Sequence, residues 1–274
     1  MRENALWAAL GAALLVAACG SSPSGTATSP DRSEEARILA EPEQSCLRRG
    51  QVKVAPGRVD ATGNGVVVVG PEADRIALVA DADSRAVSAI SLRDRRVRAT
   101  TWLEEVPSEL LVLEDGRVVV AQQSASSVAV FEPAQGYDAP LSPLCERAVA
   151  AEPRALARAE DGAVIVVSGA GARLTRLSGD ELNPGRSVRL ARDPRDIVRG
   201  RDGALFVSHM VGASITRVDP SLSEAKRISV GLTAASPFAP PVSRSRSGGQ
   251  GYSLATITTG ERERLLAPMV SVDP

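Results

Sequence analysis

The stretch "DPRDIVRGRDGALFVSHMVGASITRVDP" (residues 193–220) carries the pattern that decides the fold. It reads as a proline, a short apolar strand, an Asp-Gly turn, a β-branched strand, a small polar turn and a third alternating strand. The same order recurs in "PSELLVLEDGRVVVAQQSASSVAVFEP" and "PRALARAEDGAVIVVSGAGARLTRLSG". The recurrence indicates a structural unit copied along the chain rather than a single reaction centre.

The spacing of these copies indicates their architecture. Asp-Gly pairs begin at residues 115, 161 and 202, which are 46 and 41 residues apart, and a proline precedes each pair by eight residues. An earlier copy has Asp74 in the aspartate column and Arg75 in place of the glycine. This period is typical of propeller blades. The Asp-Gly pair suits a two-residue hairpin turn, in which both central residues have positive φ.

Each unit predicts an antiparallel sheet of three or four strands that cannot bury both of its faces alone. Radial stacking of such sheets buries those faces and protects most of the strand edges. We therefore predict an all-β protein, a β-propeller of about five or six blades, with little helix. A β-sandwich is the alternative, but it gives no reason for a cassette that repeats every 41 to 46 residues.

The repeated cassette resembles the YVTN and NHL families of β-propellers, and the resemblance covers about residues 66 to 230. It implies a fold more than a function. Exported members of this group are typically binding or scaffold proteins, and some precede a haem-bearing peroxidase-like domain on the same chain. The sequence contains no CxxCH, so this chain cannot itself attach a c-type haem.

The N-terminus predicts export and a lipid anchor. An apolar run from Ala5 to Ala18 is too short to span a bilayer and matches a secretory signal. "VAAC" (residues 16–19) resembles a bacterial lipobox, which implies a signal peptide over 1–18 and diacylglycerol and palmitate-type acylation of Cys19. The resemblance to Gram-negative lipoproteins implies sorting to the outer membrane of the cell envelope, because Gly20 stands where an aspartate commonly retains such proteins in the inner membrane. An ordinary signal peptide cleaved elsewhere is the alternative.

Composition divides the rest of the chain into a linker over residues 19–47 and a propeller domain over 48–274. Cys46 and Cys145 remain once Cys19 is lipidated, and two cysteines in an exported chain predict a disulfide. Two free thiols, or a bridge to a partner, are the alternatives. A metal site is disfavoured by the single histidine and the absence of a CxxC pair.

One polar column in the repeats is a candidate ligand-contact ring. It lies seven residues after the aspartate column, where the second strand meets its turn, and consists of Asp81, Gln122, Ser168 and His209. Aligned positions of this kind ring one end of a propeller. A lone histidine is more often a hydrogen-bonded turn residue than a base, because a general base needs a positioned partner.

No catalytic, cofactor-binding or metal-binding residues are predicted. A G-x-S-x-G elbow is absent, and turn chemistry explains the acidic pair Asp81 and Asp83. The formal net charge of −1 argues against nucleic acid as a partner, and 3% aromatic residues are too few for stacking platforms. Arg244 and Arg246 in the 232–250 segment would contact an acidic partner or lie in a solvated loop.

These observations predict a cell-envelope lipoprotein that binds or scaffolds a protein or ligand through its blade-end loops and the 232–250 segment. The membrane, through Cys19, and another envelope protein are the expected partners, a separate redox or haem protein among them. The alternative function is a metal-dependent hydrolase or lyase with its site in the propeller channel. A third interpretation is a shortened version of a longer protein, because the chain stops on what looks like a strand and a turn.

Overall fold

The computed structural model describes residues 44–50, 56–57, 59–212, 214–229, 231–232, 246–260 and 262–272. Cys19, the signal peptide, and the arginine at position 244 lie outside these ranges. The folded unit runs from Pro42 to Pro274. Within the described residues its secondary structure is β-strand apart from one short 3-10 helix, η1 (Glu72–Asp74), so the predicted all-β class is confirmed.

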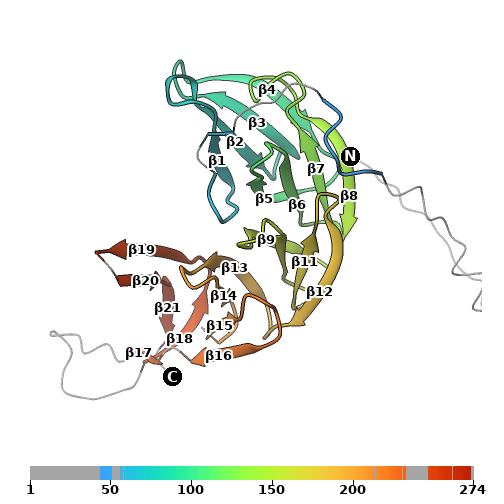
Figure 1. Cartoon of the computed structure of the whole chain (residues 1–274). Helices are drawn as coiled ribbons and strands as arrows, with labels where there is room; N and C mark the ends of the chain where they lie inside the picture. Colours follow the sequence, from blue (N-terminus) through green and yellow to red (C-terminus); the bar gives the residue numbers. More distant parts are fainter. Residues whose placement is uncertain are drawn as a thin grey trace, which may run out of the picture. The chain divides into compact units, whose positions relative to one another are not determined.

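Four of the sheets are four-stranded antiparallel meanders in sequence order (Figure 1). The first two contain β1 (Val66–Val69), β2 (Ile76–Asp81), β3 (Ala86–Ser91), β4 (Arg96–Trp102), β5 (Pro107–Val112), β6 (Val118–Gln122), β7 (Ser127–Glu132) and β8 (Ser142–Ala148). The third and fourth contain β9 (Pro153–Arg158), β10 (Val164–Ser168), β11 (Arg173–Ser178), β12 (Asn183–Arg189), β13 (Pro194–Arg199), β14 (Leu205–His209), β15 (Ser214–Val218) and β16 (Ala225–Ser229).

The C-terminal region forms two smaller sheets. A three-stranded sheet has the order β17 (Gly231–Leu232), β18 (Arg246–Gly251) and β21 (Met269–Val272), and a hairpin joins β19 (Ala255–Thr259) to β20 (Arg262–Leu266). The succession of four-stranded sheets therefore ends after β16, as the sequence indicates.

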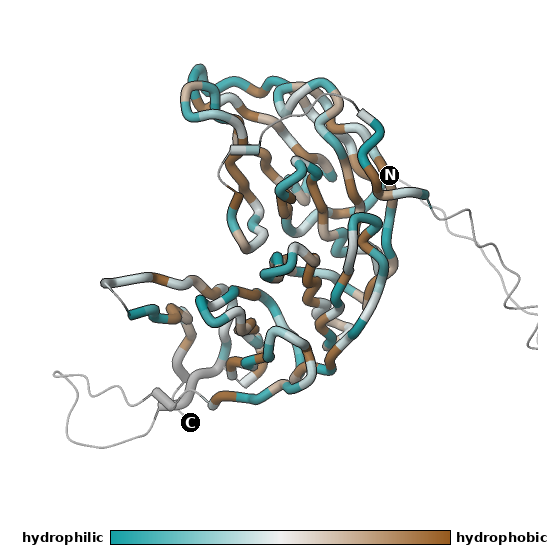
Figure 2. Tube along the Cα trace, viewed as in Figure 1, coloured by the Kyte–Doolittle hydropathy of each residue, from teal (hydrophilic) through white to brown (hydrophobic). Residues whose placement is uncertain are grey.

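The repeated prolines and Asp-Gly pairs mark equivalent positions. Pro107, Pro153 and Pro194 each begin the first strand of a sheet, where a missing N–H donor is tolerated. First strands of neighbouring sheets contact one another, β5 with β9 and β9 with β13, so they line the inside of the arrangement. Figure 2 shows hydrophobic strands and hydrophilic turns throughout these sheets.

The prediction of a two-residue Asp-Gly turn is wrong. Leu113 N–H donates to Arg117 O at 2.8 Å and Gly116 N–H donates to Leu113 O at 2.9 Å, which makes a three-residue loop. Gly116 has φ 90°, whereas Asp115 is not among the residues with positive φ. The Asp115 side chain instead accepts the Arg117 N–H. This is a type I turn closed by a glycine in the left-handed region, and Asp supplies a side-chain acceptor.

The core consists of apolar layers between successive sheets. One layer lies between the first and second sheets and contains Leu78 and Val120. The next two layers lie between the second and third sheets and between the third and fourth sheets. A smaller cluster joins the fourth sheet to the C-terminal residues through Val198, Ile215 and Leu254. Face-to-face packing of this kind buries both faces of the second, third and fourth sheets.

Candidate functional site: an open sheet face, an inner carboxylate pair and a disulfide strap

The four residues of the predicted contact ring occupy equivalent places. Asp81, Gln122, Ser168 and His209 are the last residues of β2, β6, β10 and β14. Their alignment along the sequence therefore corresponds to a shared position at the end of the second strand. Gln122, Ser168 and His209 are buried, and only Asp81 keeps a partly exposed surface. The structure places them inside their sheets rather than on one open surface.

The side chains of this column interact locally. Asp81 accepts the Ser84 N–H, and Gln122 Oε1 accepts the Ser127 hydroxyl. His209 Nδ1 lies 3.1 Å from Arg192 O and Nε2 lies 2.7 Å from Thr216 Oγ1, so Nδ1 is the protonated nitrogen of the neutral ring. Burial lowers the pKa of His209, which keeps it neutral. A bound ligand at this column stays a prediction.

The inner side of the sheets is crossed by the chain's own residues 61–64. Thr62 bridges to Ala157 and Asn64 bridges to Leu110 in isolated antiparallel pairs. Gly63 N–H donates to Leu156 O at 2.7 Å. A Cβ added to Gly63 would come within 2.9 Å of the Leu156 side chain, so this crossing requires glycine. The segment thereby links the inner strands of the second and third sheets.

Two inner carboxylates were not predicted from the sequence. Glu109 on β5 and Asp196 on β13 both lie two residues after the proline that begins their strand. Glu109 Oε2 accepts the Leu156 N–H of the third sheet at 2.9 Å. Asp196 Oδ2 accepts the Leu254 N–H at 2.6 Å. Each carboxylate therefore joins its sheet to the next part of the chain.

The surroundings of these carboxylates favour their protonated forms. Burial, and next the negative charge of Asp196, raise the pKa of Glu109 to about 8. Burial also raises the pKa of Asp196. A carboxyl group that holds its proton near neutral pH can donate or accept it, which is the property general acid–base chemistry needs.

Replacing Glu109 with glutamine is expected to remove part of the pH dependence of stability. The folded state keeps the Glu109 proton from about pH 4.5 to about pH 8 while the unfolded chain releases it, so stability falls as pH rises through that window. Glutamine does not ionise and keeps an acceptor for the Leu156 N–H. Urea unfolding should show the Glu109→Gln variant equal to the parent near pH 4 and increasingly more stable than the parent as the pH rises to about 8.

Glu114→Gln is the matched control for that measurement, because the Glu114 side chain is 81% exposed. It should leave the slope of stability against pH unchanged. Parallel curves for the parent and Glu109→Gln would contradict a desolvated Glu109.

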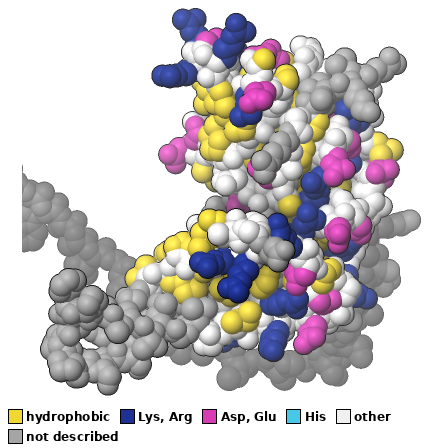
Figure 3. All heavy atoms as spheres, turned by 60° about the vertical axis from the view of Figure 1, so that its left-hand side comes forward, with side chains coloured by type: hydrophobic (Ala, Val, Ile, Leu, Met, Phe, Trp, Pro, Cys, Tyr) yellow, Lys and Arg dark blue, Asp and Glu magenta, His cyan; other side chains and the backbone are white. Residues whose placement is uncertain are grey.

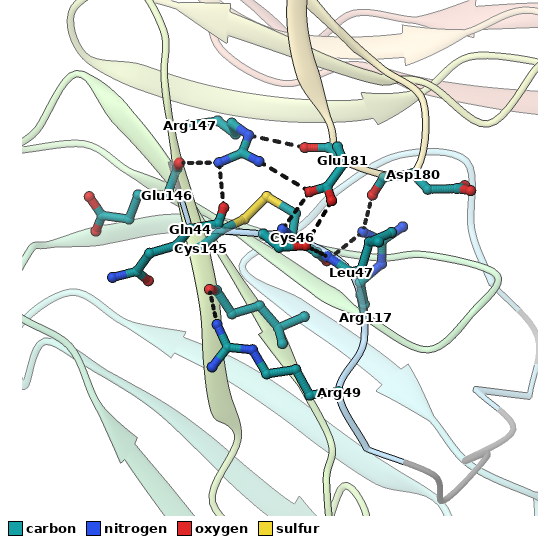
Figure 4. Close-up of a disulfide and its surroundings, with 12 residues drawn as sticks. Gln44, Cys46, Leu47, Arg49, Arg117, Cys145, Glu146, Arg147, Asp180 and Glu181 are labelled. Atoms are coloured by element: carbon teal, nitrogen blue, oxygen red, sulfur yellow. Dashed lines mark hydrogen bonds and ion pairs between the residues drawn. A yellow bond between two sulfur atoms is a disulfide. The ribbon is translucent and has the colours of Figure 1, made fainter. Parts of the chain in front are cut away.

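A strap of residues 44–50 is fixed to the second and third sheets by the disulfide between Cys46 and Cys145 (Figure 4). The disulfide prediction is confirmed. Cys46 is fully buried and belongs to the folded unit that begins at Pro42, whereas the sequence indicated a domain start at residue 48. The strap therefore belongs to the fold and not to the linker.

Two buried arginines hold the strap beside the disulfide (Figure 4). Arg117 Nη1 donates to Cys46 O at 2.8 Å and to Asp180 O at 2.6 Å. Arg147 Nη1 donates to Gln44 O and its Nε donates to Glu181 O, both at 3.0 Å. These bonds satisfy backbone carbonyls of the strap and of the turn before β12 (Asn183–Arg189).

Among the described residues, no sheet packs on the face of the first sheet that points away from the second sheet. Directly paired residues share a face, and the pairs Val66↔Val79, Ile90↔Val97 and Ala86↔Trp102 place apolar side chains on this one. Val66, Val68, Val97 and Trp102 are 49%, 43%, 61% and 73% exposed. We call this surface the open face and define it by Val66, Val68, Val79, Ile90, Val97 and Trp102.

The equivalent columns in the other sheets are buried. Val79 corresponds to Val120, Val166 and Val207, all of which are fully buried, and each faces the preceding sheet. Ile90 corresponds to Phe131, Leu177 and Val218, which are also buried. In the first sheet both columns are only half-buried. Figure 3 shows hydrophobic side chains gathered on this side of the molecule below a group of Lys and Arg side chains.

In the part of the chain that the structure describes, no three His, Cys, Asp or Glu side chains gather as a metal ion would require. No helix among the described residues is long and apolar enough to cross a membrane.

Successive four-stranded meanders with contacting inner strands define a β-propeller-like protein, and the comparisons with solved structures agree. No family model matches the chain, and no curated protein matches it. Virginiamycin B lyase from Staphylococcus aureus is similar, with 16% identity, a TM-score of 0.52, and coverage of 78% of this chain and 72% of that one.

Two other solved structures are similar. A streptogramin B lyase has 14% identity and a TM-score of 0.52, with coverage of 77% of this chain and 70% of that one. Kuenenia stuttgartiensis hydrazine synthase has 14% identity and a TM-score of 0.53, and the match covers 78% of this chain and 56% of that one. At these identities the likeness shows the fold alone, which is shared with enzymes.

Proposed function

We propose that this chain is a binding or scaffold protein of the bacterial cell envelope, of YVTN/NHL type, anchored through a lipid on Cys19. Its binding surface is the open face of the first sheet. The observation that carries this proposal is the contrast between that face and the same columns in three other sheets, which are buried against a neighbouring sheet. A sheet face with several exposed large apolar side chains on an exported protein is a surface for another polypeptide.

The lipobox-like "VAAC" (residues 16–19) and the apolar run before it support the anchor and the location at the outer membrane. The strap of residues 44–50 follows the linker in the sequence and is fixed to the second and third sheets by the disulfide and two buried arginines.

The experiment that tests this proposal is alkylation of a Val97→Cys variant, followed by mass spectrometry of the peptide that contains residue 97. The native Cys46 and Cys145 are joined and do not react. The modification should be slower in envelope membranes than in dilute purified protein, because a bound partner covers the open face. Equal rates in the two samples would overturn the proposal. Val211→Cys, at a position 48% exposed in the fourth sheet's turn, is the control.

A second candidate function is a hydrolase or lyase with its site on the inner side of the sheets. The Glu109 and Asp196 carboxyl groups and their raised pKa values favour it, as does the fold shared with virginiamycin B lyase. Both carboxylates already accept backbone N–H groups, and residues 61–64 bridge the inner strands. These contacts give the two groups a structural role, so we place this function second.

A further inference from the structure

We propose that the occupant of the open face is the open face of a second copy of this chain, in a two-fold symmetric dimer with antiparallel strands. This inference rests on the proposed function and names its partner. An isologous interface requires a patch that is complementary to itself. The open face meets this requirement in its exposed apolar side chains and in its charged ends.

The apolar side chains of the open face lie around one half-buried polar pair, Ser88 and Thr100, which the strand register places on the same face. Val66, Val68, Val97 and Trp102 are each more than 40% exposed, and Val79 and Ile90 lie between them in the pairing. Two sheets that pack face to face bury such side chains between them at about 10 Å separation. The second, third and fourth sheets of this chain bury the same columns in that way.

The basic end of the open face is formed by the β1–β2 and β3–β4 turns, which are joined by the Leu92 N–H to Arg75 O bond. Residues 92–98 contain four arginines and one aspartate, and all of them are exposed. Glu72, Asp74 and Arg75 in the neighbouring turn reduce the net charge of this end to +2. The basic end therefore keeps a positive surplus.

The opposite end of the open face is acidic. The Leu103 N–H donates to Arg85 O, which brings the β2–β3 turn beside the connection after β4. This end carries Asp81, Asp83, Glu104 and Glu105 against Arg85 alone, a net charge of −3. A two-fold axis midway between the two sheets, parallel to them and perpendicular to the strands, sets the basic end of one copy against the acidic end of the other. The charges thus select the antiparallel arrangement.

The test is sedimentation velocity of the full-length protein in mild detergent over a range of concentrations. A concentration-dependent dimer is expected, and Trp102→Lys should make the protein monomeric. Its thermal midpoint should equal that of the parent at a dilution at which the parent is also monomeric, because Trp102 is 73% exposed. Leu266→Lys, at a 49% exposed position of β20 in the C-terminal hairpin, is the matched control and should leave the dimer intact.

Charge exchange tests the orientation. Arg93→Glu with Arg96→Glu, and separately Asp83→Arg with Glu104→Arg, should each weaken the dimer at least about tenfold. The four changes together should restore it, because opposite charges again face each other. Failure of the combined variant to recover would overturn the antiparallel dimer.

Three other outcomes overturn the dimer and separate its failure from that of the proposed function. Oligomers that grow beyond two and are lost with Leu266→Lys would show head-to-tail association of different surfaces. A monomer whose Val97→Cys reacts rapidly when purified, and slowly in membranes, would show a different envelope partner and leave the proposed function standing. A monomer whose Val97→Cys is already protected would show that the chain covers its own face, and both proposals would fail.

Discussion

Replacing Cys46 and Cys145 together with alanine is expected to lower the free energy of unfolding by about 3–5 kcal/mol. The two cysteines are 99 residues apart, and a cross-link that closes so long a loop strongly restricts the unfolded chain. Cys46 is also fully buried in the layer between the second and third sheets. Urea unfolding measured by circular dichroism checks this expectation.

The parent protein treated with a reducing agent should unfold like the double variant, because both lack the cross-link. A Cys19→Ser variant is the control, since that position is far from the strap in sequence and should not change the unfolding midpoint. An unchanged midpoint for the double variant would contradict a stabilising role for the disulfide.

Replacing Arg117 with methionine is expected to cost about 3–4 kcal/mol, the second large effect. The guanidinium is 5% exposed and bonds Asp115 as well as the carbonyl oxygens of Cys46 and Asp180. Methionine fills much of the same volume but leaves both carbonyls without a donor. Chemical unfolding of the variant measures the loss.

Arg98→Met is the matched control for Arg117→Met. Arg98 also pairs with a nearby aspartate, Asp94, but its side chain is 46% exposed, so the loss should stay below about 1 kcal/mol. Combining Arg117→Met with the cysteine double variant should cost less than the sum of the separate effects, because both changes release the same strap. Strict additivity would indicate that Arg117 does not act on the strap.

The repeated sheets could be predicted because their signals are local. Proline at the start of the first strand and Asp-Gly in the following turn act within a few residues, so the alignment of Asp81 with His209 also corresponds to equivalent positions. The exact turn could not be predicted, because the Asp-Gly pair suits both a two-residue and a three-residue loop.

The residues of the candidate site that could not be identified from the sequence depend on contacts between segments far apart along the chain. Arg117 and Arg147 look like members of an arginine-rich surface, and only the strap of residues 44–50 makes them buried donors. Glu109 and Asp196 occupy a column in which the third sheet has Ala155, so the carboxylate does not recur in every repeat. A comparison of the residues that follow each repeated proline would have been the available signal.

The open face could not be predicted for the same reason. Val79 and Val120 each lie between an apolar residue and an alanine and hold the same position in the repeat, but among the described residues only Val120 has a sheet packed against it. Whether an apolar column is covered depends on which sheets precede and follow it.

The central claim, that the open face of the first sheet binds another polypeptide in the envelope, is tested most directly by one rate ratio. It is the alkylation rate of Val97→Cys in envelope membranes divided by the rate in dilute purified protein, with Val211→Cys measured beside it. The account predicts at least about tenfold protection at residue 97 and little change at residue 211, because only the former lies in a buried interface. Equal ratios at the two positions would contradict it.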